Sequence, residues 1–279
     1  PSLDGSAVSM VIITGDALVS EYQRLADWRT STGNYTVIRT VNWIEQNYPE
    51  GVDLQDSIRR FIHDAVSRWT AGRVLLTGAT DIVPVRYGKT AYFEGEDIPA
   101  DLYYQCLDRN WNENGNSAFG EGYYTDGPGQ VNTGDDADIL PDIWVARIPL
   151  STPAGVKAVI DKTFQYERTP PLKNYIPAFL CMAEMLQPPN WNPGDLVLFD
   201  GAELGESAIA NIPPGFRITR MYENHTDPRW AGVALPEEKN AVIDSINVGY
   251  EIVHHIGHGF RNNVSVGLGG KEIERTDAD

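Results

Sequence analysis

Three of the five histidines of this 279-residue chain lie within five residues, at positions 254, 255 and 258. His258 stands between two glycines, directly after an apolar stretch that ends at Ile256. Glycine offers no side chain to pack, but it lets a substrate or another backbone approach closely. Ligands of α/β proteins bind at the carboxyl ends of strands. The pattern indicates either a functional histidine at a strand end or a simple turn in which the imidazole caps a backbone group.

Two kinds of chemistry could use these histidines. One is metal binding, because His255 and His258 have the HxxH spacing of zinc ligands on a helix. We expect a strand from Glu251 to Ile256, however, which points His254 and His255 to opposite faces and disfavours a shared metal. The other is general acid–base catalysis by His258, exposed at the strand end, with the other two histidines as partly buried neighbours.

A catalytic histidine needs a group that orients it and a nucleophile. Glu184 directly follows the predicted strand 176–183 and stands where an orienting carboxylate would be; the alternative is an ordinary solvated loop residue. Cys181 lies in the middle of that strand and reads as a core residue. Cys106 lies in an irregular segment, and nothing in the sequence brings it to His258. No serine has the surroundings of a nucleophile elbow. The nucleophile is therefore missing from the pattern.

Composition narrows the function classes. The formal net charge of −17 disfavours nucleic-acid binding, which needs clustered Lys and Arg. Two cysteines make no disulfide framework. No apolar run approaches the roughly 20 residues of a membrane span, and no signal peptide is present. Both ends look cut, so we expect a piece of a longer protein.

Apolar runs and helical stripes alternate along the chain. Val8–Ile13, Tyr35–Val41 and Arg73–Gly78 read as strands, and a helix capped by Asp53 precedes the third. This alternation predicts parallel sheets flanked by helices. The prolines within Arg168–Leu172 mark a boundary. We predict two consecutive α/β subdomains, residues 1–168 and 169–279.

The first subdomain contains a long irregular insertion, residues 81–141. Four oxygen-bearing side chains occur there at every second position, followed by Gly115, as in loops that present ligands to calcium: Asp108, Asn110, Asn112 and Asn114. The alternative is an Asn-rich turn whose side chains bond their own backbone. A second acidic cluster has the same two readings: Asp135, Asp136 and Asp138.

Several segments, in order, resemble the gingipain-type cysteine peptidases, a caspase-like clan of secreted bacterial proteases. They include Val11-Ile-Ile-Thr14, Asp101-Leu-Tyr-Tyr104, Pro141-Asp-Ile-Trp-Val-Ala-Arg-Ile-Pro149 and Gly257-His258-Gly259. The resemblance covers nearly the whole chain. It implies a caspase-like α/β fold and a secreted cysteine endopeptidase, extracellular or at the cell surface, that acts on protein or peptide substrates.

The resemblance also implies residue roles. His258 would be the catalytic histidine, Glu184 the acid that orients it, and the Gly259 N–H part of the oxyanion hole. Asp195 would lie at the floor of the S1 pocket, as a buried carboxylate that pairs with Arg or Lys at P1. Family members bind calcium, which favours a structural calcium ion in the loop that begins at Asp108. No organic cofactor is implied.

One departure concerns the nucleophile. In the family the catalytic cysteine follows the histidine on the next strand, and this chain stops at Asp279. We therefore expect the nucleophile beyond residue 279 and this chain alone to be inactive. The alternatives are a non-catalytic binding or scaffold relative and a metal-dependent hydrolase that uses the three clustered histidines.

Overall fold

The computed structural model of the chain describes residues 7–89, 97–121, 124–125, 131–132, 134–135, 137, 140–172, 175–188, 191–260, 262–267 and 272–278. The chain divides into two compact units, Pro1–Pro170 and Pro171–Asp279. The division falls within the proline-rich segment where the sequence places a boundary, two residues after the predicted one.

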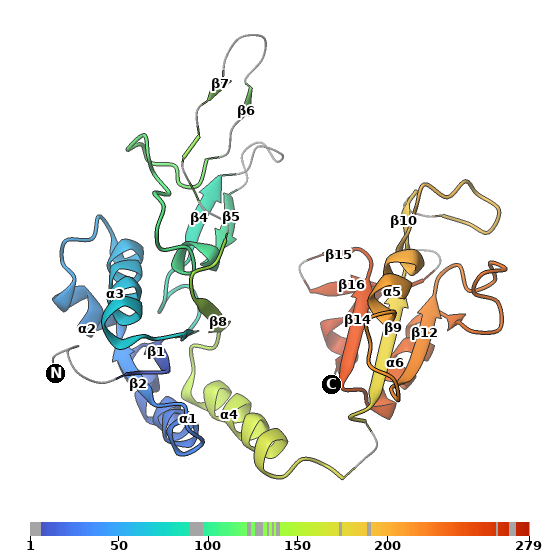
Figure 1. The fold of residues 1–279 in the computed structure, drawn as a ribbon, viewed down its shortest axis with the longest axis horizontal. Helices are drawn as coiled ribbons and strands as arrows, with labels where there is room; N and C mark the ends of the chain where they lie inside the picture. Colours follow the sequence, from blue (N-terminus) through green and yellow to red (C-terminus); the bar gives the residue numbers. More distant parts are fainter. Residues whose placement is uncertain are drawn as a thin grey trace. The chain divides into compact units, whose positions relative to one another are not determined.

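A parallel sheet forms the centre of unit 1, with the strand order β2-β1-β3-β8 (Figure 1). Its strands are β1 (Met10–Thr14), β2 (Thr36–Thr40), β3 (Arg73–Thr77) and β8 (Trp144–Ile148). The helices are η1 (Asp16–Leu18), α1 (Val19–Ser31), α2 (Val41–Asn47), α3 (Leu54–Trp69) and α4 (Pro153–Arg168). Val11 and Ile13 pack into the core cluster that contains residues of α2 and α3, and Ile12 into the one that contains residues of α1 and α4. Because successive apolar side chains of β1 point to opposite faces of the sheet, both faces must be covered by helices.

Helix α3 begins where the sequence predicts. Asp53 accepts a hydrogen bond from the Asp56 amide at 2.9 Å, and the same carboxylate receives two from Arg86, at 2.7 and 2.8 Å. The buried stripe of α3 includes Ile58, Phe61 and Ile62. One side chain thus caps the helix and ties it to the insertion.

The insertion is less irregular than expected. β4 (Arg86–Lys89) pairs antiparallel with β5 (Asp97–Ala100), η2 (Asp101–Tyr104) follows, and β6 (Tyr124–Thr125) pairs with β7 (Val131–Asn132). Arg147 of β8 holds the Asp101 carboxylate with two hydrogen bonds of 2.7 Å.

Unit 2 has its own parallel sheet, in the order β13-β12-β9-β14. Its strands are β9 (Ala178–Ala183), β12 (Arg217–Tyr222), β13 (Leu235–Pro236) and β14 (Ile252–Ile256). α5 (Gly201–Ile209) and α6 (Lys239–Val248) contribute to separate core clusters, and alternate residues of β9 enter one or the other. Shorter elements complete the unit: β10 (Met185–Gln187), β11 (Phe199–Asp200), β15 (Gly259–Phe260), β16 (Asn263–Ser265), β17 (Glu272–Glu274) and η3 (Arg275–Ala278).

The two consecutive units with mainly parallel sheets confirm the predicted fold class. The prediction of a buried strand at 251–256 is wrong in one respect. β14 is the last strand of the described sheet and pairs there only with β9, so Ile252 and Val253 are 40% and 45% exposed. Among the described residues, no helix has the length and apolar character needed to cross a membrane.

Candidate active site

Glu184 is the first residue after β9, at the carboxyl end of the unit 2 sheet. Its amide donates to the Ile256 carbonyl at 2.9 Å, and its carbonyl accepts from the Gly201 amide at 3.1 Å. These bonds tie the residue to the end of β14 and to the start of α5. The side chain is buried, with 5% of its surface exposed. The alternative of a solvated loop residue is therefore wrong.

His258 contacts the Glu184 carboxylate through two groups. Its backbone N–H donates to Glu184 Oε2 at 2.7 Å, and its ring Nδ1 lies 3.2 Å from the same oxygen. The imidazole is 54% exposed. A buried carboxylate at Nδ1 favours the tautomer with its proton there and stabilises an imidazolium. Because Nε2 makes no hydrogen bond within the described residues, it is available to exchange a proton with a substrate.

The glycines beside His258 have different surroundings. A Cβ added to Gly257 would lie 2.7 Å from Glu184 Oε2 and 2.7 Å from His255 Nε2, so a larger residue would displace the carboxylate. Gly259 is exposed and begins β15, opposite Val264 of β16. Its position directly after His258 is compatible with the predicted oxyanion role.

The three clustered histidines have three different environments. The ring of His254 stacks on Phe179, with the centroids 6.1 Å apart. Nε2 of His255 lies 2.9 Å from the Ser265 carbonyl, and His258 faces Glu184. In the part of the chain that the structure describes, no group of three or more His, Cys, Asp or Glu side chains could hold a metal ion. Nothing in this arrangement favours the metal-dependent hydrolase.

Neither cysteine of the chain has the surroundings of a nucleophile. Cys181 and Cys106 are both fully buried. Burial raises the pKa of the Cys181 thiol to about 11, which opposes formation of the thiolate. Both are core residues, as the sequence predicted for Cys181.

Asp195 lies in an exposed turn. Its Oδ2 accepts from the Asn192 amide at 2.9 Å, and its carbonyl accepts from the buried Trp191 indole at 3.2 Å. The expectation of a buried carboxylate does not match this exposed position. The side chain is accessible to a substrate, and its role in specificity stays a prediction.

The loop that begins at Asp108 is stabilised mainly by its own side chains. Asn110 Oδ1 accepts from the Asn112 amide at 2.9 Å, and Asn114 Oδ1 accepts from the Asn116 amide at 3.0 Å. These are the Asx turns of the alternative interpretation. Asn112 Oδ1 is buried and has no hydrogen-bond partner in the part of the insertion that the structure describes, and Asp108 is exposed. Two of the four expected oxygen ligands are thus already engaged with the backbone.

The second acidic cluster is only partly described. Asp135 is buried and accepts from the amides of Glu113 and Glu121, at 2.8 and 3.1 Å. Asp136 and Asp138 lie outside the described residues.

Two further carboxyl groups, not predicted from the sequence, lie near the candidate site. Glu223 directly follows β12 and Glu237 directly follows β13, as Glu184 follows β9. Both are buried, and Glu223 Oε2 accepts from the Met185 amide at 2.7 Å. For Glu223 the available signal was its position directly after a largely apolar run, whereas the two residues of β13 gave no such signal for Glu237.

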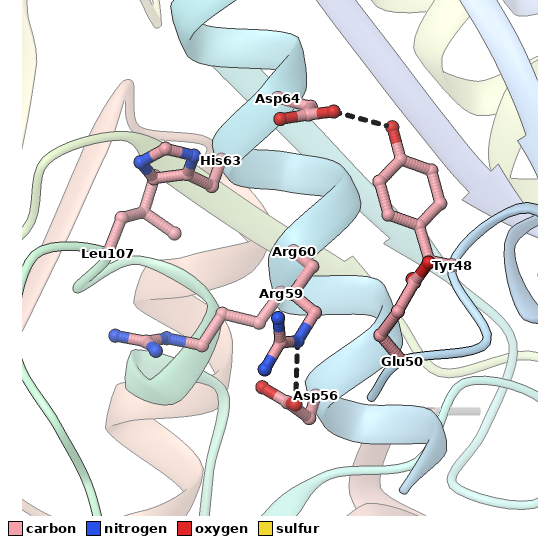
Figure 2. Close-up of a pocket in the computed structure, with 8 residues that line it drawn as sticks. All are labelled: Tyr48, Glu50, Asp56, Arg59, Arg60, His63, Asp64 and Leu107. Carbon is pink, nitrogen blue, oxygen red and sulfur yellow. Dashed lines mark hydrogen bonds and ion pairs between the residues drawn. The ribbon is translucent and has the colours of Figure 1, made fainter. Parts of the chain in front are cut away.

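Unit 1 contains a separate pocket of about 450 Å³, lined largely by residues of α3 (Figure 2). Figure 2 shows two hydrogen bonds between residues that line the pocket: Tyr48 donates to Asp64, and Arg60 donates to Asp56. Arg59 points to one side, where it donates to backbone carbonyls. The charges of this pocket are thus largely used within the protein, and none of the predicted catalytic residues lines it.

Comparison with known proteins identifies relatives of the chain. The model of the family described as Peptidase family C25 matches residues 4–278. A solved structure described as the complex of the pro- and mature domains of Porphyromonas gingivalis RgpB is 18% identical, with a TM-score of 0.57, over 94% of this chain and 50% of that chain. Another, described as the structure of a protease, is 16% identical, with a TM-score of 0.60, over 99% of this chain and 49% of that chain.

At these identities the solved structures show a common fold. The chain spans about half the length of both. No curated protein matches it.

Proposed function

Because the chain belongs to peptidase family C25, a family of cysteine peptidases, we propose that it carries the acid–base half of a cysteine endopeptidase site. The observation that carries the proposal is the contact of the exposed His258 imidazole with the buried Glu184 carboxylate, 3.2 Å from Nδ1 to Oε2. Such a pair, at the carboxyl end of a parallel sheet, provides a proton acceptor and donor whose orientation is set by its partner.

The chemistry would be acyl transfer. A cysteine thiolate attacks the peptide carbonyl, and the Gly259 N–H stabilises the oxyanion that forms. His258 donates its Nε2 proton to the leaving amine as the C–N bond breaks. It then takes a proton from water, which attacks the thioester and regenerates the thiolate. Glu184 keeps Nδ1 protonated throughout and stabilises the imidazolium.

The nucleophile in this proposal lies beyond residue 279. Two observations support it. Both cysteines of the chain are fully buried, and β14 has no partner strand on its outer side among the described residues. A following strand that pairs there would bring its carboxyl end beside His258, because the ends of parallel strands meet at one edge of the sheet. The absence of an accessible thiol equally supports the alternative of a non-catalytic binding relative.

Substrate preference, location and calcium are finer proposals. A preference for Arg or Lys at P1, through a charge-assisted contact with Asp195, rests on the resemblance, because that carboxylate is exposed and not buried in a pocket. The resemblance supports secretion. The unpartnered Asn112 oxygen supports a structural calcium ion, whereas the Asx turns at Asn110 and Asn114 do not. Thermal melting with calcium and with a chelator tests that ion: no difference between the two melting temperatures would contradict it.

The deciding experiment uses a protein extended past Asp279. It is mixed with acyloxymethyl-ketone probes that carry Arg, Lys, Asp or Leu at P1, and the intact mass is measured. We expect one adduct with the Arg or Lys probe, lost in His258→Ala and weakened in Asp195→Asn. An adduct with another probe alone would keep the mechanism and discard Asp195. No adduct in a folded, calcium-loaded protein would favour the binding relative.

A further inference from the structure

Three buried glutamates form a row across the carboxyl end of the unit 2 sheet. Glu184, Glu223 and Glu237 each directly follow a strand, and those strands are neighbours in the order β13-β12-β9. Figure 1 shows β12 and β9 side by side. The last residues of the three strands are in register: Tyr222 pairs with Ala183 and with Pro236. The exposed fractions of the three glutamates are 4%, 7% and 2%. Ile256 also pairs with Ala183, so the row continues into the segment that carries His258.

Glu223 holds the segment that contains Glu184. Its amide donates to the Ala183 carbonyl at 3.0 Å, and its Oε2 accepts from the Met185 amide at 2.7 Å. It therefore binds the residue on each side of Glu184. The Ile256 carbonyl and the Gly201 amide bind the backbone of Glu184 itself, but these partners belong to the main chain. Glu223 is the side chain that completes the support.

Burial and the neighbouring carboxylates oppose ionisation of Glu223 and Glu237. Burial raises the pKa of Glu223 and the negative charge of Glu184 adds to that rise, whereas the hydrogen bond from the Met185 amide and the charge of His258 oppose it. Burial, with the charges of Glu184 and Glu223, holds the pKa of Glu237 well above its ordinary value. Among the described residues, neither side-chain oxygen of Glu237 has a hydrogen-bond partner within normal distance, and the Gly267 amide lowers its pKa less than the other groups raise it. A carboxyl oxygen accepts an N–H bond in either protonation state, so Glu223 can hold Met185 without a negative charge.

We infer that Glu223 is a positioning residue, which acts through the Met185 amide to keep the Glu184 carboxylate against Nδ1 of His258. This inference rests on the proposed function, because Glu184 and His258 are the acid–base pair of that proposal. Its required feature is an acceptor oxygen at the end of a side chain of this length.

Two substitutions distinguish the position of the Glu223 acceptor oxygen from the charge of its carboxylate. Glu223→Gln keeps an acceptor oxygen in place and removes the ability to ionise. Glu223→Asp keeps a carboxylate but withdraws it by about one C–C bond, ~1.5 Å, which puts it beyond hydrogen-bond distance of the Met185 amide. Glu237→Gln is the matched control, because Glu237 belongs to the same buried row and no hydrogen bond between its side chain and the Met185 amide is found.

The measurement is the ¹⁵N spectrum of the imidazoles in the folded 279-residue chain. It reports the ratio of the Nδ1–H to the Nε2–H tautomer of His258 and does not require peptidase activity. We expect that ratio to stay within about twofold of the wild-type value in Glu223→Gln and Glu237→Gln, and to fall about tenfold in Glu223→Asp, the effect of losing one charge-assisted contact. In the extended protein, kcat should follow the same order.

An unchanged ratio in Glu223→Asp would overturn the inference, as would an equal loss in Glu223→Gln, which would make charge the relevant property. Circular dichroism checks folding; if Glu223→Asp does not fold, Glu223→Leu, with no acceptor, replaces it with the same expectation. The proposed function fails separately, through the absence of any probe adduct, whatever the tautomer ratio shows.

Discussion

Gly257→Ala should damage the Glu184–His258 pair directly. The added Cβ would lie 2.7 Å from Glu184 Oε2, 2.8 Å from its Cδ and 2.7 Å from His255 Nε2. Ordinary contacts begin near 3.4 Å, so these atoms would have to move by 0.6–0.7 Å. Glu184 is buried and held by backbone bonds on both sides, and therefore cannot swing into solvent.

The expected cost follows from these contacts. Extra methyl groups in a well-packed interior cost about 1–3 kcal/mol. Replacing glycine by alanine also reduces the entropy of the unfolded chain, which returns about 0.4–1 kcal/mol. The net loss in the free energy of unfolding should be about 1–2 kcal/mol, and the urea midpoint of unit 2 should fall by about 0.5–1 M.

Urea denaturation followed by hydrogen-exchange mass spectrometry of β9 and β14 peptides measures this loss in unit 2 separately. Gly72→Ala is the control, because no atom lies within 4 Å of its added Cβ. Since two of the three close contacts at Gly257 belong to Glu184, the cost should shrink in a Glu184→Ala background. A Gly257→Ala protein as stable as wild type, or a cost that is equal in both backgrounds, would refute the reasoning.

Three further predictions concern charged groups. Glu184→Gln should slow probe labelling of the extended protein about tenfold or more, because the interaction energy of the carboxylate with the half-exposed imidazole is about 2 kcal/mol after solvent screening. Glu203→Gln, at an exposed glutamate, is the control and should have no effect. Asp53→Ala should lower stability by about 1–2 kcal/mol through the lost helix cap, as urea denaturation would show. Burial raises the pKa of Asp53, but Arg86 and backbone amides outweigh burial and lower the pKa below 3.8. The stabilisation by the ionised Asp53 is therefore present above pH 3.8 and is lost as the pH falls through the folded-state pKa. Glu237→Gln should stabilise the protein relative to wild type, by a margin that grows as the pH rises from 4.5 towards the raised folded-state pKa, because the folded state retains a proton that the unfolded chain releases; equal stability profiles would contradict this.

Local signals predicted the elements well. The Asp53 cap and the helix that it begins depend on residues close together in sequence, and both are present. The partnership of Glu184 with His258 was also predictable, since each residue ends or follows a parallel strand and such ends meet.

Features that depend on which strands are neighbours in the sheet were harder to predict from the sequence. The exposure of β14 depends on which strand lies beside it, and its own composition does not contain that information. The role of Glu223 depends on the register between β12 and β9, which places it beside Met185. Hydrogen bonds of 2.9–3.0 Å within the Asn110 loop show that its side chains bond their own backbone, which the sequence pattern alone does not reveal.

Arg59 attaches the insertion of unit 1 to α3 through backbone carbonyl groups. From α3 its guanidinium donates to the carbonyls of Tyr103, Cys106 and Arg109, at 3.1, 2.6 and 2.7 Å. A backbone carbonyl is present whatever the side chain, so this anchor does not depend on the identity of the residues it holds. The exposed positions of the segment, such as Asp108 and Asn110, can therefore exchange residues, provided that the path still returns three carbonyls to one arginine, whereas Tyr103 and Cys106 belong to the core. Unit 1 thus offers a place for engineering new surface properties, apart from the unit that carries His258.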